Sequence, residues 1–382
     1  MTLERPSTKK SGEEQPKSGE VSRREFLKAG TGAAAFVFTN ILAGKTVEAS
    51  LAVEKAVNKD RREGEPKVEI EIYYAAHDTG ADIKELAGKI KQADIFAPEL
   101  FGENKQLLDI LSGFSEGKIS PEEFFQARGL DIQNIKEGFE PFSVALSKAI
   151  YNTQKIIVPF DVPTGHLLYS RMEDLGQYKV NPFLPFSKLL ASYKRSLYET
   201  ANTQKEREQL MLRRLLYLKK EILRGALPAL VNKDRVRILI FLGAVHTGVY
   251  HQLKTRGEAV SRSFPHMPLV FGGTSEEIMR RFMFRKEVND TLVAKGLLES
   301  ALSFLLYGRL SEISADTLLK MQFLRKMAAA FTPQEIEKFF DEIRTGGKNQ
   351  EETRTATLEQ LTNKGFHMPS SEEELKDIAE YK

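Results

Sequence analysis

The chain contains no cysteine among its 382 residues. Disulfide bonds, thiolate metal sites and cysteine nucleophiles are therefore excluded. A metal or acid–base site has to use the carboxylates and the six histidines. No segment beyond the N-terminal region is long and apolar enough to cross a bilayer, so we expect no membrane span in the mature chain.

The chain also has little net charge and no internal repeat. Of the formal net charge of +3, residues 1–49 contribute +2. The remainder is nearly neutral, which gives no electrostatic reason to expect a nucleic-acid partner. The proportions of hydrophobic residues (41%) and charged residues (29%) are typical of a globular protein, and the length permits a sizeable core.

The N-terminal region has the pattern of an export signal. Arg23 and Arg24 precede an uncharged stretch rich in glycine and alanine, residues 29–44, and Lys45 follows it. Small residues at 47 and 49 are spaced as a signal peptidase requires. We predict a twin-arginine signal peptide over residues 1–49, export by the twin-arginine machinery, and a periplasmic or other extracytoplasmic location. The alternative is a chance Arg-Arg pair before an apolar segment.

Hydrophobic patterning predicts an α/β fold with a mainly parallel sheet covered by helices. Apolar runs indicate strands at 68–74, 94–100, 155–160 and 235–242, and helical segments lie between them. We predict a linker at 50–67, an α/β core at 68–288, a helical extension at 289–345 and a polar tail at 346–382.

Finer expectations concern segments around this sheet. The predicted segments are a long loop over 163–187, a long helix over 188–224, a short helix over 249–255, an edge strand over Met267–Phe271, successive helices over 275–344, and a loose stretch over 345–370 before a short acidic helix.

Four polar residues each follow the end of a predicted strand: His77, Glu99, Asp161 and His246. Parallel strands bring such ends to one edge of a sheet, where α/β proteins place their chemistry. Two imidazoles and a carboxylate suit a borderline divalent metal, and a second carboxylate could act as a base. Each residue also has an ordinary interpretation, as a helix cap, a loop residue or a turn cap.

The order of several short motifs resembles one superfamily. The motifs are AAHD, APEL, IIVPFD, a helix containing Lys205-Glu206-Arg207-Glu208, and FLGAVHTG. Over residues 68–256 this order resembles the superfamily of erythromycin esterase, ChaN, TraB and Tiki proteins. The resemblance implies an α/β sandwich with two Gly-x-x-His motifs, a glutamate after the second strand, an aspartate after a middle strand and an arginine on a helix.

Residue by residue, the resemblance assigns roles within this chain. Residues 243–246 match the second Gly-x-x-His motif, whereas Tyr74 stands in place of the glycine in the first, with His77 kept. It implies a metal site formed by His77, Glu99 and His246, holding Mn, Zn, Fe or Co. It implies catalytic roles for Glu99, Asp161 and Arg207. From the residues alone, Arg207 could equally be a solvated charge on a strongly charged helix.

Three functions are compatible with this sequence. The first is an exported metal-dependent hydrolase acting on a peptide, amide or ester bond, with a small-molecule or peptide substrate. The second is a non-catalytic haem-, metal- or peptide-binding protein of the ChaN or TraB type. The third is an interaction protein that has lost its site.

Of the other histidines, His166 could reach a ligand from its loop, His251 could support His246, and His266 and His367 are expected at the surface.

Overall fold

In a computed structural model, the chain folds into an α/β region built on one sheet, together with a helical region. The described residues are 65–75, 80–127, 142–176, 184–264, 273–314, 316–345 and 350–379. The predicted signal peptide, most of the predicted linker and His77 lie outside them. Among these residues, no helix has the length and apolarity needed to span a bilayer.

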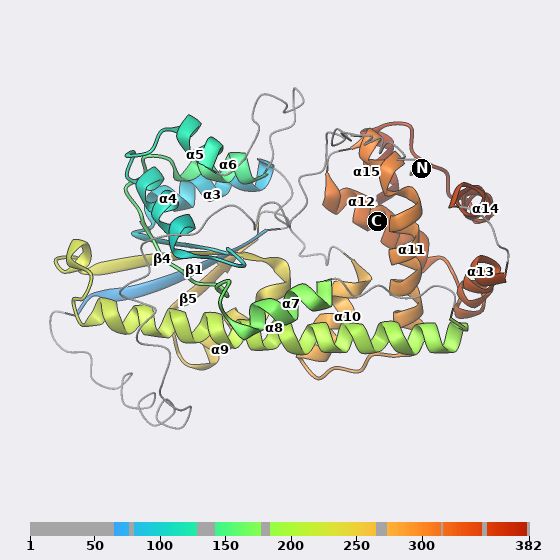
Figure 1. Cartoon of the computed structure of the whole chain (residues 1–382), viewed down its shortest axis with the longest axis horizontal. Helices are drawn as coiled ribbons and strands as arrows, with labels where there is room; N and C mark the ends of the chain where they lie inside the picture. Colours follow the sequence, from blue (N-terminus) through green and yellow to red (C-terminus); the bar gives the residue numbers. More distant parts are fainter. Residues whose placement is uncertain are drawn as a thin grey trace, which may run out of the picture.

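The strands form one five-stranded, all-parallel sheet in the order β3-β2-β4-β1-β5 (Figure 1). They are β1 (Lys67–Ala75), β2 (Ile95–Pro98), β3 (Ile156–Ile157), β4 (Arg235–Gly243) and β5 (Val260–Ser263). The two long central strands pair over their full length, from Lys67 opposite Arg235 to Ala75 opposite Gly243. The predicted α/β fold with a mainly parallel sheet is confirmed.

Both faces of the sheet are buried, which explains the apolar runs in the strands. On one face, even-numbered residues of β1 and β4, such as Ile72 and Ile240, pack against the second half of α8 (Phe186–Leu223) and against α9 (Thr247–Thr255). On the other face lie residues such as Tyr73 and Phe241. The helices on that face are α3 (Gly80–Gln92), α4 (Lys105–Ser115), α5 (Pro121–Ala127) and α6 (Phe142–Ile150).

Helix α8 connects this sheet to a second, wholly helical region (Figure 1). Its 38 residues extend for about 57 Å at 1.5 Å per residue. Leu189 and Tyr193 in its first half belong to the helical core, whereas Met211 and Leu215 in its second half belong to the sheet core. The residues near the middle of α8 therefore lie where the two regions meet.

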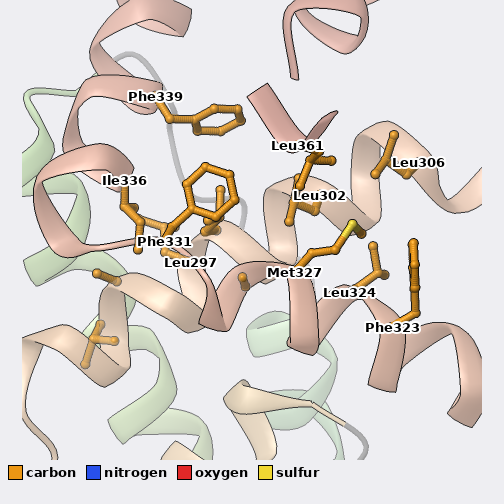
Figure 2. Close-up of a cluster of buried hydrophobic side chains, with 14 of the residues drawn as sticks. Leu297, Leu302, Leu306, Phe323, Leu324, Met327, Phe331, Ile336, Phe339 and Leu361 are labelled. Atoms are coloured by element: carbon orange, nitrogen blue, oxygen red, sulfur yellow. The ribbon is translucent and has the colours of Figure 1, made fainter. Parts of the chain in front are cut away.

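From Thr274 to Thr345 the described residues are mainly helical, as predicted, and helices continue to Ala379. The helices are α10 (Thr274–Met283), α11 (Asp290–Ile313), α12 (Thr317–Ala329), α13 (Pro333–Thr345), α14 (Gln350–Asn363) and α15 (Glu372–Ala379). Figure 2 shows part of the core they share, in which Leu302, Phe323 and Met327 are fully buried or nearly so. These helices pack mainly on the first half of α8 rather than on the sheet.

Two finer predictions need correction, and a third lies outside the described residues. The expected loop over 163–187 contains α7 (Leu167–Gly176), whose Leu168 and Tyr169 pack on α8; the flanking prolines and glycines bound a helix instead of excluding one. The expected loose stretch over 345–370 contains α14, which is rich in helix-forming residues and buries Leu361. One edge of the sheet is formed by β5, which we did not predict. The predicted edge strand Met267–Phe271 lies outside the described residues and stays a prediction. Short 3-10 turns also occur at η1 (Pro228–Leu230) and η2 (Ala244–His246).

Candidate functional site

Glu99 and His246 meet at the carboxyl edge of the sheet because they follow two hydrogen-bonded neighbours, β2 and β4. Glu99 comes directly after β2, and its backbone N–H donates to the carbonyl of Phe241 at 2.9 Å. Its carboxylate Oε2 accepts from the backbone N–H of Gly243 at 2.6 Å. The first residue of the Gly-x-x-His segment thereby fixes the orientation of the Glu99 side chain.

The imidazole of His246 is completely buried next to this carboxylate. Its Nε2 lies 3.5 Å from Glu99 Oε1, which is just beyond a good hydrogen bond. Neither ring nitrogen has a hydrogen-bond partner among the described residues. Burial and the Arg207 charge lower the pKa of His246, but the carboxylates of Glu99 and Glu208 outweigh them and raise it to about 9.

Arg207 joins the two predicted carboxylates from the middle of α8. Its Nη2 donates to Glu99 Oε1 at 2.7 Å, and its Nε donates to Asp161 Oδ1 at 2.8 Å. Burial alone would lower the pKa of Arg207, but Asp161 and Glu99 hold it above its ordinary value. The side chain is only 3% exposed, so the alternative interpretation as a solvated charge is wrong.

Asp161 is the second carboxylate that Arg207 binds. Its carboxylate is fully buried, binds the guanidinium through both oxygens and accepts from the backbone N–H of Val162 at 2.7 Å. The structure therefore brings Glu99, Asp161, Arg207 and His246 into one connected group. Within it, Asp161 holds Arg207 in position against Glu99.

A second buried ion pair, Glu103 with Arg214, supports this group and was missed in the sequence. Glu103 accepts from the backbone N–H of Phe160 at 3.2 Å, and Arg214 donates to the carbonyl of Asp161. Arg214 lies on α8, as Arg207 does. It is seven residues after Arg207, a spacing that puts both on one helix face, and this spacing was the signal available.

The first motif differs from the resembled pattern at Tyr74, and the structure shows what this ring does. Its hydroxyl donates to the backbone carbonyl of His246 at 3.2 Å. The ring stacks on Phe264 at a centroid distance of 5.0 Å. Tyr74 thus braces the second motif from the neighbouring strand.

Among the described residues, the remaining histidines hydrogen-bond or pack elsewhere. His166 is exposed, and its Nδ1 accepts from the backbone N–H of Leu168 at 3.1 Å, at the start of α7. His251 is exposed and packs edge-on against Phe284. His367 is at the surface, as predicted, in an ion pair with Glu374. His266 lies outside the described residues.

No family model, curated protein or solved structure matches this chain.

The Glu99–His246 pair fits a divalent metal as two of its ligands. Donors bound to one ion at about 2.1 Å lie about 3 to 3.4 Å apart, close to the observed 3.5 Å. The unpartnered ring nitrogen is the kind of buried group that an ion would satisfy. Across the described ranges no three His, Asp or Glu side chains gather as a metal site, and the third expected ligand, His77, lies outside those ranges.

Proposed function

We propose that the chain is an exported metal-dependent hydrolase that cleaves a peptide, amide or ester bond in a small-molecule or peptide substrate. One observation carries the proposal: the carboxylate of Glu99, only 10% exposed, stands between the buried imidazole of His246 and the buried guanidinium of Arg207. A potential metal ligand pair is thereby combined with a fixed positive charge at the carboxyl edge of a parallel sheet.

In this proposal Glu99 and His246, with His77, hold the ion, which would be Mn, Zn, Fe or Co. A divalent ion bound there supplies Lewis-acid activation of water and of the scissile carbonyl. Arg207 contributes positive charge toward a developing oxyanion or a substrate carboxylate. Asp161 keeps that charge in place, because the guanidinium cannot turn away without breaking its paired hydrogen bonds.

The proposed location follows from the twin-arginine signal at residues 1–49. Export by that machinery would deliver the folded α/β and helical regions to the periplasm or another extracytoplasmic compartment. The mature chain would start near the predicted linker at 50–67.

The alternative proposal is a non-catalytic protein that binds haem, metal or a peptide. The observation that favours it is that Arg207 engages both carboxylates at once. A carboxylate that already accepts from a guanidinium is a weaker general base. Such a site can hold a ligand without activating water.

The test uses the mature chain, stripped of metal and then loaded separately with Mn²⁺, Zn²⁺, Fe²⁺ or Co²⁺. We expect hydrolysis within a panel of fluorogenic peptides, anilides and aryl esters only after loading. We expect it to be lost in Glu99→Gln and His246→Ala and retained in His251→Ala, the matched control on α9. Haem absorbance without any hydrolysis would favour the binding protein, and hydrolysis that is equal in all variants would refute the site.

A further inference from the structure

Glu208, the residue after Arg207 on α8, approaches His246 at its other ring nitrogen. Its Oε1 lies 3.7 Å from His246 Nδ1, and the side chain is only 2% exposed. We propose that Glu208 is a positioning residue that accepts a hydrogen bond from the Nδ1–H of His246 and so leaves Nε2 facing Glu99. The use of this orientation in metal binding rests on the proposed function.

The first support is that both atoms lack other partners. Among the described residues, neither Glu208 Oε1 nor His246 Nδ1 has a hydrogen-bond partner. A buried carboxylate oxygen and a buried ring nitrogen are each costly to leave unsatisfied. A modest closure of the 3.7 Å separation would satisfy both atoms at once.

The second support is the glycine at position 248, in the first turn of α9. A Cβ atom there would lie 2.9 Å from Glu208 Cδ and closer still to Oε2. The backbone of Gly248 is helical, so its conformation does not require glycine. Glycine inside a helix costs about 1 kcal/mol relative to alanine. The space it leaves is occupied by the Glu208 carboxylate.

The chemistry explains why such a pair is useful. A histidine that binds a metal through one nitrogen commonly donates its other N–H to a carboxylate, which fixes the tautomer and the ring orientation. Consecutive residues of α8 then serve the two site residues: Arg207 holds Glu99, and Glu208 holds His246. Both lie where the sheet core and the helical core meet.

The test observes the Nδ1 proton directly in metal-free protein. With ¹⁵N-labelled histidine, the six imidazoles are few enough to assign, and His246 is identified by its loss in His246→Ala. We expect wild type to show a slowly exchanging Nδ1 proton on His246. Glu208→Ala should lose that signal, and Glu208→Gln, which keeps an acceptor oxygen, should retain it.

Gly248→Ala provides an independent variant with Glu208 intact. The added methyl group should displace the carboxylate and abolish the same proton signal. In a double-mutant cycle on the free energy of unfolding, Gly248→Ala should cause no loss beyond that of Glu208→Ala. If metal binds, its affinity should fall about 10- to 100-fold in Glu208→Ala and in Gly248→Ala.

An Nδ1 proton signal that is absent in wild type, or unchanged in Glu208→Ala, would overturn the positioning role. Effects of the two substitutions that simply add would overturn the explanation for Gly248. Because the proton signal is read without metal, a failure of metal binding with the predicted signals would refute the proposed function and leave this inference standing.

Discussion

Arg207 donates a 2.7 Å hydrogen bond to Glu99, joining the middle of α8 to the residue that follows β2. The bond links residues 108 positions apart. Since the first half of α8 belongs to the helical core and the second half to the sheet core, this contact couples the site to the junction of both regions.

Removal of Arg207 should destabilise the fold strongly. Arg207→Met removes the guanidinium that pairs with the fully buried Asp161 and the largely buried Glu99, which costs about 3–5 kcal/mol in the free energy of unfolding. The matched control is Arg171→Met, which breaks a 2.7 Å ion pair with Glu206 in which both side chains are about half exposed. Urea unfolding should show a loss of less than about 1 kcal/mol for this control. Equal losses in the two variants would contradict the buried network.

The Glu103–Arg214 pair predicts a specific dependence of stability on pH. Burial raises the pKa of Glu103 from 4.5 to about 7, with Arg214 opposing the rise and Asp161 adding to it. The folded chain therefore binds this proton more tightly than the unfolded chain does. The resulting stabilisation is complete below about pH 4.5 and is lost as the pH rises through about 7.

Glu103→Gln should flatten that decline. From about pH 5 to 7, the wild-type free energy of unfolding should include a fall of up to about 3 kcal/mol from this group, to be measured by urea titration at each pH. Glu122→Gln, on the exposed side of α5, should leave the slope unchanged. The same slope in Glu103→Gln and wild type would show that Glu103 does not change its protonation on folding.

The helical region should be stabilised by its own core. Phe323 is fully buried, so Phe323→Ala should cost about 3–5 kcal/mol. Phe304 is 72% exposed on α11, and Phe304→Ala should change stability by no more than about 0.5 kcal/mol. Thermal unfolding followed by circular dichroism measures both. A small effect at Phe323 would mean that the core drawn in Figure 2 is not tightly packed in solution.

Export should depend on the arginine pair of the N-terminal region. Changing Arg23 and Arg24 to Lys keeps the charge but removes the proposed recognition signal. We expect the precursor to accumulate unprocessed inside the cell, as judged by fractionation and immunoblotting. Changing Lys9 and Lys10 to Arg is the control, and it should be processed normally. Normal processing of the Arg23/Arg24 variant would refute twin-arginine export.

The sequence predicted the elements whose patterns are local. Buried strands such as β4 are continuous apolar runs, and their parallel arrangement predicted that Glu99 and His246 would meet. Side-chain contacts between residues far apart in the sequence could not be predicted from local patterns. Whether Arg207 is solvated or buried depends on Glu99 and Asp161, far away in the chain. Glu208 and Gly248 are related only through the packing of α8 against α9.

The most direct test of the central claim is a Co²⁺ titration of the metal-free mature chain, followed by visible absorption. We predict that wild type and His251→Ala each bind one ion at the Glu99–His246 site, with absorption bands that saturate together with binding. His246→Ala and Glu99→Gln should remain folded and lose this binding. Absence of Co²⁺ binding in wild type, or undiminished binding in His246→Ala, would contradict the account.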